Sequence, residues 1–246
     1  MGKVAGVDRL GSALAHADYV RRAFDPGADY WRGYYAHDPE ARERLRAFAE
    51  ALQSVHARGN WLDAGCGIGV IARQLRRSDL RICGVDASPD LLQRASAVTG
   101  LRVLTEGPAP EEEHLYRTPL ERLPYEDERF DGVYSSSVLE YVASLDLALA
   151  ELRRVVRRDG HLIFSMPNAF SVFRVAQALR GRRDGYFRLV PRWAYWRWEI
   201  AGALRRTGWR PISSRYFGGH RRLHRRLAGA PFAAMFTLVV AQKAHR

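Results

Sequence analysis

Three glycines that follow an aspartate form the segment of this sequence with the clearest chemical meaning. Residues 61–69 read Trp-Leu-Asp-Ala-Gly-Cys-Gly-Ile-Gly, so an apolar run ends in Asp63 and glycines follow at Gly65, Gly67 and Gly69. Glycine has no Cβ atom, so such a turn can bend tightly, adopt positive φ angles and bring its backbone against a ligand. A strand, a glycine-rich turn and a following helical pattern predict a loop that cradles a nucleotide.

The spacing of the glycines limits the class of nucleotide. A dinucleotide fingerprint requires Gly-x-Gly-x-x-Gly, and Val70 stands at its sixth position. The Gly-Lys-Ser/Thr ending of a phosphate-binding loop does not follow these glycines. Asp63 would repel a pyrophosphate, whereas its carboxylate suits a ligand that carries an ammonium or sulfonium charge.

A second carboxylate, Asp86, ends the next apolar strand, which we expect at 81–86. In α/β nucleotide folds an acidic residue about 20 residues beyond the glycines accepts hydrogen bonds from ribose hydroxyls. Ser88 and Pro89 then fit the N-cap and first turn of a new helix. Taken singly, these features have ordinary explanations, a tight turn for the glycines and a helix N-terminal charge for Asp86.

Together and in this order, the motifs resemble the S-adenosylmethionine-dependent methyltransferases of the Rossmann-like class. Three further segments carry the likeness, at 123–131, 135–142 and 156–162, and it covers roughly residues 45–166. The resemblance implies an α/β fold with a doubly wound, seven-stranded sheet and an antiparallel strand seven. It also implies S-adenosyl-L-methionine as the cofactor and methyl transfer as the reaction.

The resemblance further implies a set of cofactor-binding residues at the carboxyl ends of strands: Asp63, Gly65, Cys66, Gly67, Gly69, Asp86, Ala87, Leu120, Glu121, Ser135 and Ser136. The glycine loop would approach the methionine and ribose portions of the cofactor. Asp63 and the backbone carbonyls of Ser135 and Ser136 would face its ammonium group.

The adenine and ribose contacts implied by the resemblance come from the next two strand ends. Asp86 would hold both ribose hydroxyls, and Ala87 and Leu120 would sandwich the adenine. Family members often hold the adenine amino group with an aspartate, but Pro119 stands at that position here. Glu121 or a backbone carbonyl would therefore have to accept that hydrogen bond, or the contact is missing.

An aromatic segment at 29–35 lies in the N-terminal part of the chain, residues 1–45, ahead of a predicted methyltransferase domain at 46–246. In the family an N-terminal segment often folds over the bound cofactor, and Tyr30 and Trp31 resemble such a helical lid. Packing of these rings against the protein core explains them equally well.

The sequence does not identify a catalytic base. Methyl transfer is an in-line displacement at a sulfonium carbon, so proximity and orientation supply much of the acceleration. A base is needed only if the acceptor must lose a proton. Many relatives have a histidine where Tyr141 stands here. Tyr141, His37 and His220 are the candidates, although both histidines also fit ordinary surface positions.

The elements that must position these residues alternate along the chain. We expect strands at 60–64, 81–86, 114–118, 130–135, 161–165, 209–215 and 235–241. We expect helices at 39–55, 68–77, 89–98, 145–157 and 195–206. Residues 101–104 alternate like a strand, but glycine and proline at 107–110 interrupt them. A substrate-covering insertion is expected at 168–195 and a basic hairpin at 216–230.

Length and composition indicate one α/β domain with appendages, since 246 residues with 47% hydrophobic content allow a full core. Cys66 and Cys83 lack a metal-ligand spacing and suit reduced core thiols of a cytoplasmic protein, so no metal is expected. No signal peptide is visible, and the apolar run at 231–241 is too short to span a bilayer. We expect a monomer or a homodimer.

Arginine supplies nearly all of the formal net charge of +12. Solvated arginine-rich faces explain this charge, and so does attraction to anionic lipids, acidic substrates or RNA. The densest cluster, 220–227, predicts a short amphipathic basic helix that fits a peripheral contact with an anionic membrane or the mouth of an anionic-acceptor site. It lacks the interleaved aromatics that stack bases, so nucleic acid is not an expected partner.

The expected acceptor is a small or lipid-like molecule methylated at oxygen or carbon. Residues 113–124 and 186–191 are faintly similar to O-methyltransferases of ubiquinone biosynthesis, which act on prenylated phenols at the membrane surface. Ser135–Ser137 stand where many amino-group methyltransferases carry Asn/Asp-Pro-Pro-Tyr/Phe. An RNA or protein methyltransferase and a catalytically silent cofactor-binding protein are the alternatives, and the intact glycine loop argues against the second.

Overall fold

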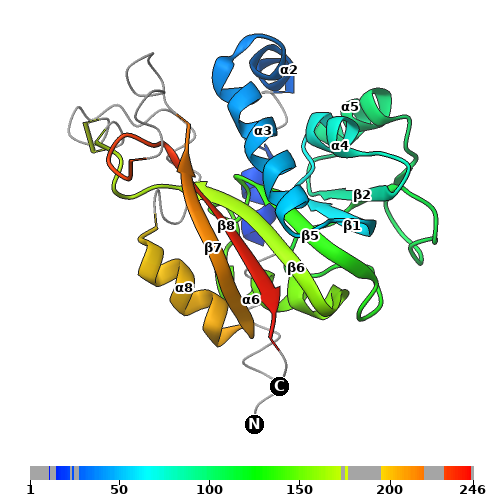
Figure 1. Cartoon of the computed structure of the whole chain (residues 1–246). Helices are drawn as coiled ribbons and strands as arrows, with labels where there is room; N and C mark the ends of the chain where they lie inside the picture. Colours follow the sequence, from blue (N-terminus) through cyan, green and yellow to red (C-terminus); the bar gives the residue numbers. More distant parts are fainter. Residues whose placement is uncertain are drawn as a thin grey trace.

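The structure, a computed structural model, describes residues 11, 15–22, 24, 28–172, 175–176, 195–218 and 230–244. Its centre is an eight-stranded sheet in the order β3-β4-β2-β1-β5-β6-β8-β7 (Figure 1). The strands are β1 Gly59–Ala64, β2 Leu80–Asp86, β3 Val103–Leu104, β4 Leu115–Arg117, β5 Phe130–Ser136, β6 Val156–Pro167, β7 Trp209–Phe217 and β8 Phe236–Lys243. The helices are α2 Ala28–His37, α3 Pro39–Ser54, α4 Val70–Leu75, α5 Pro89–Thr99, α6 Leu145–Val155 and α8 Arg197–Arg206.

The pairing of the strands confirms the predicted Rossmann-like fold. The strands from β3 to β6 pair in parallel, and β8 pairs antiparallel with both β6 and β7. The chain moves outward from β1 to β3 and then returns to β5 on the other side of β1, so the strand order reverses there. The sheet has one strand more than predicted because residues 103–104 pair with β4 as a two-residue edge strand.

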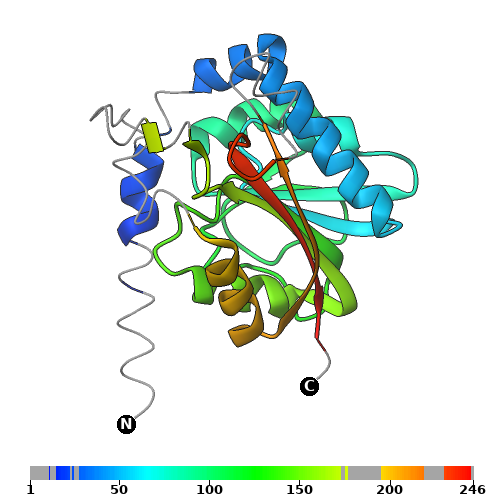
Figure 2. The same cartoon turned by 60° about the vertical axis from the view of Figure 1, so that its left-hand side comes forward.

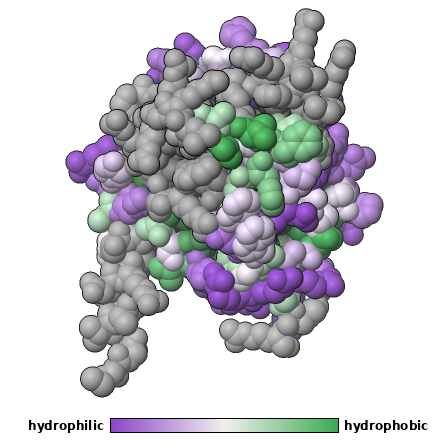
Figure 3. Space-filling view, turned by 90° about the vertical axis from the view of Figure 1, so that its left-hand side faces the viewer, coloured by the Kyte–Doolittle hydropathy of each residue, from purple (hydrophilic) through white to green (hydrophobic). Residues whose placement is uncertain are grey.

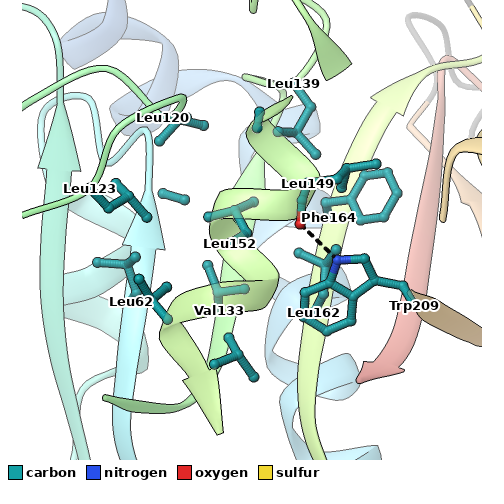
Figure 4. Close-up of a cluster of buried hydrophobic side chains, with 14 of the residues drawn as sticks. Leu62, Leu120, Leu123, Val133, Leu139, Leu149, Leu152, Leu162, Phe164 and Trp209 are labelled. Atoms are coloured by element: carbon teal, nitrogen blue, oxygen red, sulfur yellow. Dashed lines mark hydrogen bonds between the residues drawn. The ribbon is translucent and has the colours of Figure 1, made fainter. Parts of the chain in front are cut away.

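Side chains alternate between two buried layers, one on each face of the sheet. Leu62, Val133 and Leu162 face α6 and α8, where the Trp209 indole donates a hydrogen bond to the Leu149 carbonyl at 3.0 Å (Figure 4). Their strand neighbours face α3 and α4 in a second cluster that includes Trp61, Tyr134 and Ile163. Because both faces are covered, the central strands are apolar on both sides, as is typical of parallel sheets.

The helix ends follow the local signals in the sequence. Ser88 caps α5 by accepting a hydrogen bond from the Leu91 amide at 3.1 Å, and Gly100 ends the helix in the left-handed conformation. Helix α4 is shorter than the predicted 68–77, because Gly69 before it is left-handed and Arg76 after it is extended. Strand β6 begins directly after α6, earlier than predicted.

The N-terminal part of the chain forms helices that precede β1 in the sequence. Residues 15–22 form a short helix that stands apart from α2 in Figure 2. The predicted boundary between residues 45 and 46 falls inside α3, whose apolar side packs against the sheet. Most of the predicted insertion, 177–194, and of the basic hairpin, 219–229, lies outside the described residues. In the described part of the chain, no helix is long and apolar enough to cross a membrane.

Candidate functional site

A cavity of about 360 Å³ lies beside the carboxyl ends of β1, β2 and β5. The strand order reverses at this point, and ligands of open α/β sheets bind in such crevices. One wall comes from the loops that follow the strands, and the opposite wall comes from α2 and the first turns of α3. The site therefore combines residues close together in the sequence with residues from the N-terminal part of the chain.

Two of the predicted glycines, Gly65 and Gly67, line this cavity, and each has a different structural requirement. Both have positive φ, +82° and +53°. A Cβ atom on Gly65 would lie 2.3 Å from a methyl group of Val138, so the packing of the fold excludes a side chain there. A Cβ on Gly67 would meet no atom of the described residues within 4 Å, so a ligand has room above this glycine.

The third glycine, Gly69, shapes the loop without lining the cavity. It is left-handed at the start of α4, and a Cβ there would lie 2.9 Å from the Thr99 methyl group. Cys66 does line the cavity, and burial raises the pKa of its thiol well above the usual range, so the thiol stays neutral.

The Asp86 carboxylate joins the glycine loop to the start of α5. One oxygen accepts a hydrogen bond from the Gly67 amide at 2.9 Å, and the other accepts one from the Ser88 amide at 2.9 Å. Asp86 and Ala87 line the same cavity as Gly67. Asp86, which was predicted to hold the ribose hydroxyls, and Ala87, which was predicted to flank the adenine, therefore lie beside the open backbone at Gly67.

Leu120 and Glu121, which were predicted to contact the adenine, also line the cavity. Both are nearly buried, and the Glu121 carboxylate accepts a hydrogen bond from the Ala143 amide at 3.2 Å. Burial raises the pKa of Glu121. Glu121 therefore borders the cavity, and its role as an acceptor for the adenine amino group stays a prediction.

Asp63 is not among the described residues that line the cavity, and its contact with the cofactor ammonium stays a prediction. Its side chain is 1% exposed, and one of its oxygens has no hydrogen-bond partner. Burial raises the pKa of Asp63 to about 8, the Asp86 charge adds to the rise, and the Tyr134 hydroxyl opposes it. At neutral pH this carboxyl group is therefore mostly protonated and supplies little negative charge.

The two predicted serines at the end of β5 have different surroundings. Ser135 is fully buried, and its hydroxyl donates to the Ala64 carbonyl at 2.8 Å, which ties β5 to β1. Ser136 lines the cavity together with Ser137, which has a φ of +56°. Only the second of the predicted pair, Ser136, is thus among the residues that border the cavity.

A buried arginine that the sequence analysis missed faces the cavity from α3. Arg44 is 5% exposed, and its guanidinium donates to the hydroxyls of Ser136 at 3.1 Å and Ser137 at 2.5 Å. The guanidinium lies 3.6 Å from the Glu40 carboxylate and 4.3 Å from the centre of the Phe236 ring. Its Nε atom has no hydrogen-bond partner among the described residues. A buried guanidinium with a spare donor suits an anionic group of a ligand.

A sequence signal for Arg44 was present on the apolar side of α3. Ala41, Arg44, Leu45 and Phe48 are all buried and recur at helical spacing, so a charged residue interrupts an apolar stripe. Glu40, one residue before this stripe, accepts a hydrogen bond from the Tyr34 hydroxyl at 2.9 Å. Burial raises the pKa of Tyr34 above its ordinary value, so this phenol acts as a neutral hydrogen-bond donor.

Aromatic residues of the N-terminal part border the cavity. Tyr30 and Trp31 both line it from α2. The Phe24 ring stacks on Trp31 at 6.2 Å and meets Tyr141 edge-on at 5.0 Å. A ring nitrogen of His16 lies 2.9 Å from the Tyr141 carbonyl. These contacts place an aromatic wall from residues 15–35 against the loop after β5.

The three candidates for a catalytic base occupy different places. Tyr141 lines the cavity, whereas His37 is exposed at the end of α2 and does not line it. His220 lies outside the described residues. Across the described ranges, no group of three or more histidine, cysteine, aspartate or glutamate residues could hold a metal ion.

Comparison with known proteins identifies the type of domain. Residues 62–164 match the family model of a methyltransferase domain. A malonyl-[acyl-carrier protein] O-methyltransferase of Serratia marcescens is 30% identical over 65% of this chain and 56% of its own length. The protein of the same name from Geobacter sulfurreducens is 29% identical over 78% of this chain and 70% of its own length. The chain spans less than two thirds of the length of most such relatives, 47% in Halorhodospira halophila.

Solved structures share the fold at low sequence identity. A 1,6-didemethyltoxoflavin-N1-methyltransferase of Burkholderia thailandensis, crystallised with S-adenosylhomocysteine, superposes with a TM-score of 0.66. It is 18% identical, over 95% of this chain and 91% of its own. A methyltransferase of Thermotoga maritima superposes equally well at 16% identity, over 89% of this chain and 98% of its own. These likenesses agree with the strand order found here.

Proposed function

We infer that this chain, which carries a methyltransferase domain of the S-adenosylmethionine-dependent, Rossmann-like class, transfers a methyl group to a small-molecule or lipid-like acceptor. S-Adenosyl-L-methionine is the cofactor of this class and supplies the methyl group on its sulfonium sulfur. The observation that carries the proposal is the single cavity into which the glycine loop, Asp86, Leu120 and Arg44 all face.

The residues around the cavity fit the parts of this cofactor. Asp86 would hold the ribose hydroxyls, and Ala87 and Leu120 would flank the adenine. The open space above Gly67 would receive the ligand against the backbone. Arg44 has a spare buried donor and would pair with the carboxylate of the methionine portion. We therefore propose Arg44, rather than Asp63, as the principal charged contact to that portion.

We propose oxygen as the methylated atom. The curated relatives are named as O-methyltransferases of malonyl-[acyl-carrier protein], and a carboxylate acceptor is already an oxyanion. Such an acceptor needs no proton removed, and among the described residues that line the cavity Tyr141 is the one candidate base. The protein would then act by holding the two reactants in line and by excluding water with the aromatic wall.

The test is methyl transfer from labelled S-adenosylmethionine to a panel of acceptors. The panel should include malonyl-acyl carrier protein, prenylated phenols, RNA and unrelated protein. Label on a carboxylate or phenol supports the proposal, and label on RNA or protein refutes it in favour of the first alternative. Tight cofactor binding without transfer to any acceptor class would instead support a catalytically silent protein.

We also propose that the protein is cytoplasmic, monomeric or homodimeric, and makes peripheral contact with anionic membrane surfaces. The net charge of +12 supports the membrane contact, since an anionic leaflet attracts basic surfaces. Sedimentation with anionic vesicles at low salt, and its loss at high salt, tests this contact.

A further inference from the structure

Exposed apolar side chains gather on one side of the described structure, around α8 and β7. Among the described residues, eight large hydrophobic side chains are exposed; Phe170, Trp198 and Ile212 line a groove between α8 and β7, and Val172, Val175 and Phe232 belong to the segments after β6 and before β8. Trp198 is 61% exposed and Phe232 is 52% exposed. Figure 3 looks at this side of the molecule and shows apolar side chains grouped on its surface. We call these six residues, with Trp196, Arg197 and Arg205, the α8 face.

A groove between α8 and β7 forms the centre of the α8 face. Phe170, Trp198 and Ile212 line it, and the Trp196 and Trp198 rings stack nearly parallel with centres 4.9 Å apart. Phe170 meets Trp196 edge-on at 4.7 Å. These ring contacts hold the aromatic side chains in a fixed, outward-facing arrangement, so little conformational freedom is lost when a partner covers them.

The charged side chains described in the groove are basic. Arg197 and Arg205 line it, and none of the described residues that line it is acidic. The Arg197 guanidinium donates to the Ser214 hydroxyl at 2.9 Å and lies 5.8 Å from the centre of the Tyr216 ring. Glu199, the acidic residue nearest in sequence, accepts a hydrogen bond from the Trp196 amide at 2.9 Å and is not among the lining residues. The α8 face is therefore complementary to an anionic surface.

The α8 face adjoins the methyl-transfer cavity. Pro167 and Phe236 line the cavity, and Phe170 and Pro231 line the groove only a few residues away in the sequence. The Asn168 side chain joins these segments by donating to the Pro231 carbonyl at 2.6 Å and the Ala234 carbonyl at 2.9 Å. A surface that covers the α8 face would therefore lie beside the cavity.

We propose that the α8 face docks on an anionic lipid bilayer, with Trp198, Ile212 and Phe232 among the head groups and Arg197 and Arg205 against lipid phosphates. The inference rests on the membrane contact proposed above and assigns it to described residues, whereas the basic segment 220–227 lies outside the described part of the chain. Tryptophan combines an apolar ring with an N–H donor and is enriched at membrane interfaces. Arginines near an anionic leaflet add electrostatic attraction. An acidic protein would satisfy the arginines but would not require protruding aliphatic side chains.

The test compares variants in sedimentation with vesicles of phosphatidylcholine and phosphatidylglycerol at low salt. Replacing Arg197 and Arg205 by glutamine should lower the partition coefficient about 30-fold, the effect of two basic residues at an anionic surface. Replacing Ile212 and Phe232 by serine, which leaves Trp196 and Trp198 in place as reporters, should reduce the quenching of tryptophan fluorescence by brominated lipid. The matched control replaces Arg81 and Arg102 by glutamine, because both are exposed near the opposite edge of the sheet.

The outcomes separate this inference from the broader proposal. All variants should retain affinity for S-adenosylmethionine in calorimetry, which verifies that they are folded. If the parent protein does not sediment with anionic vesicles, both the membrane contact and the role of the α8 face are overturned. If the parent sediments and the α8-face variants sediment equally, only the role of the α8 face is overturned. Retention on polyglutamate through Arg197 and Arg205, without vesicle binding, would indicate an acidic protein partner and overturn the lipid assignment.

Discussion

Substituting Gly67 separates a ligand effect from a folding effect, because its Cβ would point into open cavity space. Gly67→Val costs stability through its positive φ of +53°, on the order of 1–2 kcal/mol for a left-handed residue that is not glycine. Its amide can still donate to Asp86, since that hydrogen bond uses only the backbone. The domain should therefore fold, with the valine methyl groups standing where we propose that the cofactor lies.

The expected loss of affinity follows from this geometry. A parent Kd near micromolar corresponds to about −8 kcal/mol, and overfilling a tight contact costs on the order of 1–3 kcal/mol or more. Gly67→Val should thus weaken S-adenosylmethionine binding by about 5- to 150-fold, and Gly67→Ala by less. Isothermal titration calorimetry gives the affinity, and urea unfolding gives the stability of the same samples.

Gly100→Val is the matched control. Gly100 has a φ of +75°, and a Cβ there meets no atom within 4 Å, but it caps α5 and does not line the cavity. It should lose a similar amount of stability and no affinity. Normal cofactor binding by Gly67→Val would refute the proposed path of the ligand along the loop. Equal affinity losses in both variants would show that the effect is one of folding.

Three further predictions test other parts of the site. Asp86→Ala should weaken S-adenosylmethionine binding by roughly 1.5–3 kcal/mol in calorimetry, which is the scale of hydrogen bonds to a charged group. An unchanged affinity would contradict the proposal that Asp86 binds the ribose hydroxyls. Arg44→Gln should lower the affinity for S-adenosylmethionine on a similar scale but leave the affinity for 5′-methylthioadenosine, which lacks the carboxylate, unchanged. Equal losses of affinity for both ligands would contradict the pairing of Arg44 with that carboxylate. The raised pKa of Asp63, about 8, means that the folded state holds a proton that the unfolded state releases near pH 4. Stability should therefore fall as pH rises from about 4 to 8, by at most about 1.4 kcal/mol per pH unit, and Asp63→Asn should flatten this slope in urea unfolding.

Much of the fold was predictable because its signals are local. The glycine loop, the Ser88 cap and the apolar strands predicted β1, α5 and the order of the central elements within a few residues. The edge strand β3 was ambiguous in the sequence because only two residues pair there, through hydrogen bonds to a segment about a dozen residues later. Pairing partners of that kind are set by tertiary structure and leave little trace in local sequence.

The residues of the candidate site also fall into two groups, those predictable from local sequence and those placed by contacts between distant segments. Gly65, Gly67, Asp86 and Ala87 lie within about 20 residues, and the parallel pairing of β1 with β2 brings their loops together. Arg44 enters from a helix that precedes the glycine loop, and its role depends on contacts with Ser136, Ser137 and Phe236. The burial of Asp63 also depends on the neighbouring strands, so the sequence alone did not predict that this carboxylate is enclosed by the sheet.

The chemistry of methyl transfer explains why the reaction class is easier to predict than the acceptor. The methyl donor arrives with its leaving group, so the protein must mainly bind, orient and exclude water. The cofactor half of the cavity therefore follows a recurrent sequence pattern. The other half is built from Phe24, Trp31 and Tyr141, whose ring contacts join distant segments. Changing Phe24 should alter which acceptors react more than it alters cofactor affinity, because we expect the acceptor to lie against that part of the wall, whereas Trp31 belongs to the lid expected over the cofactor.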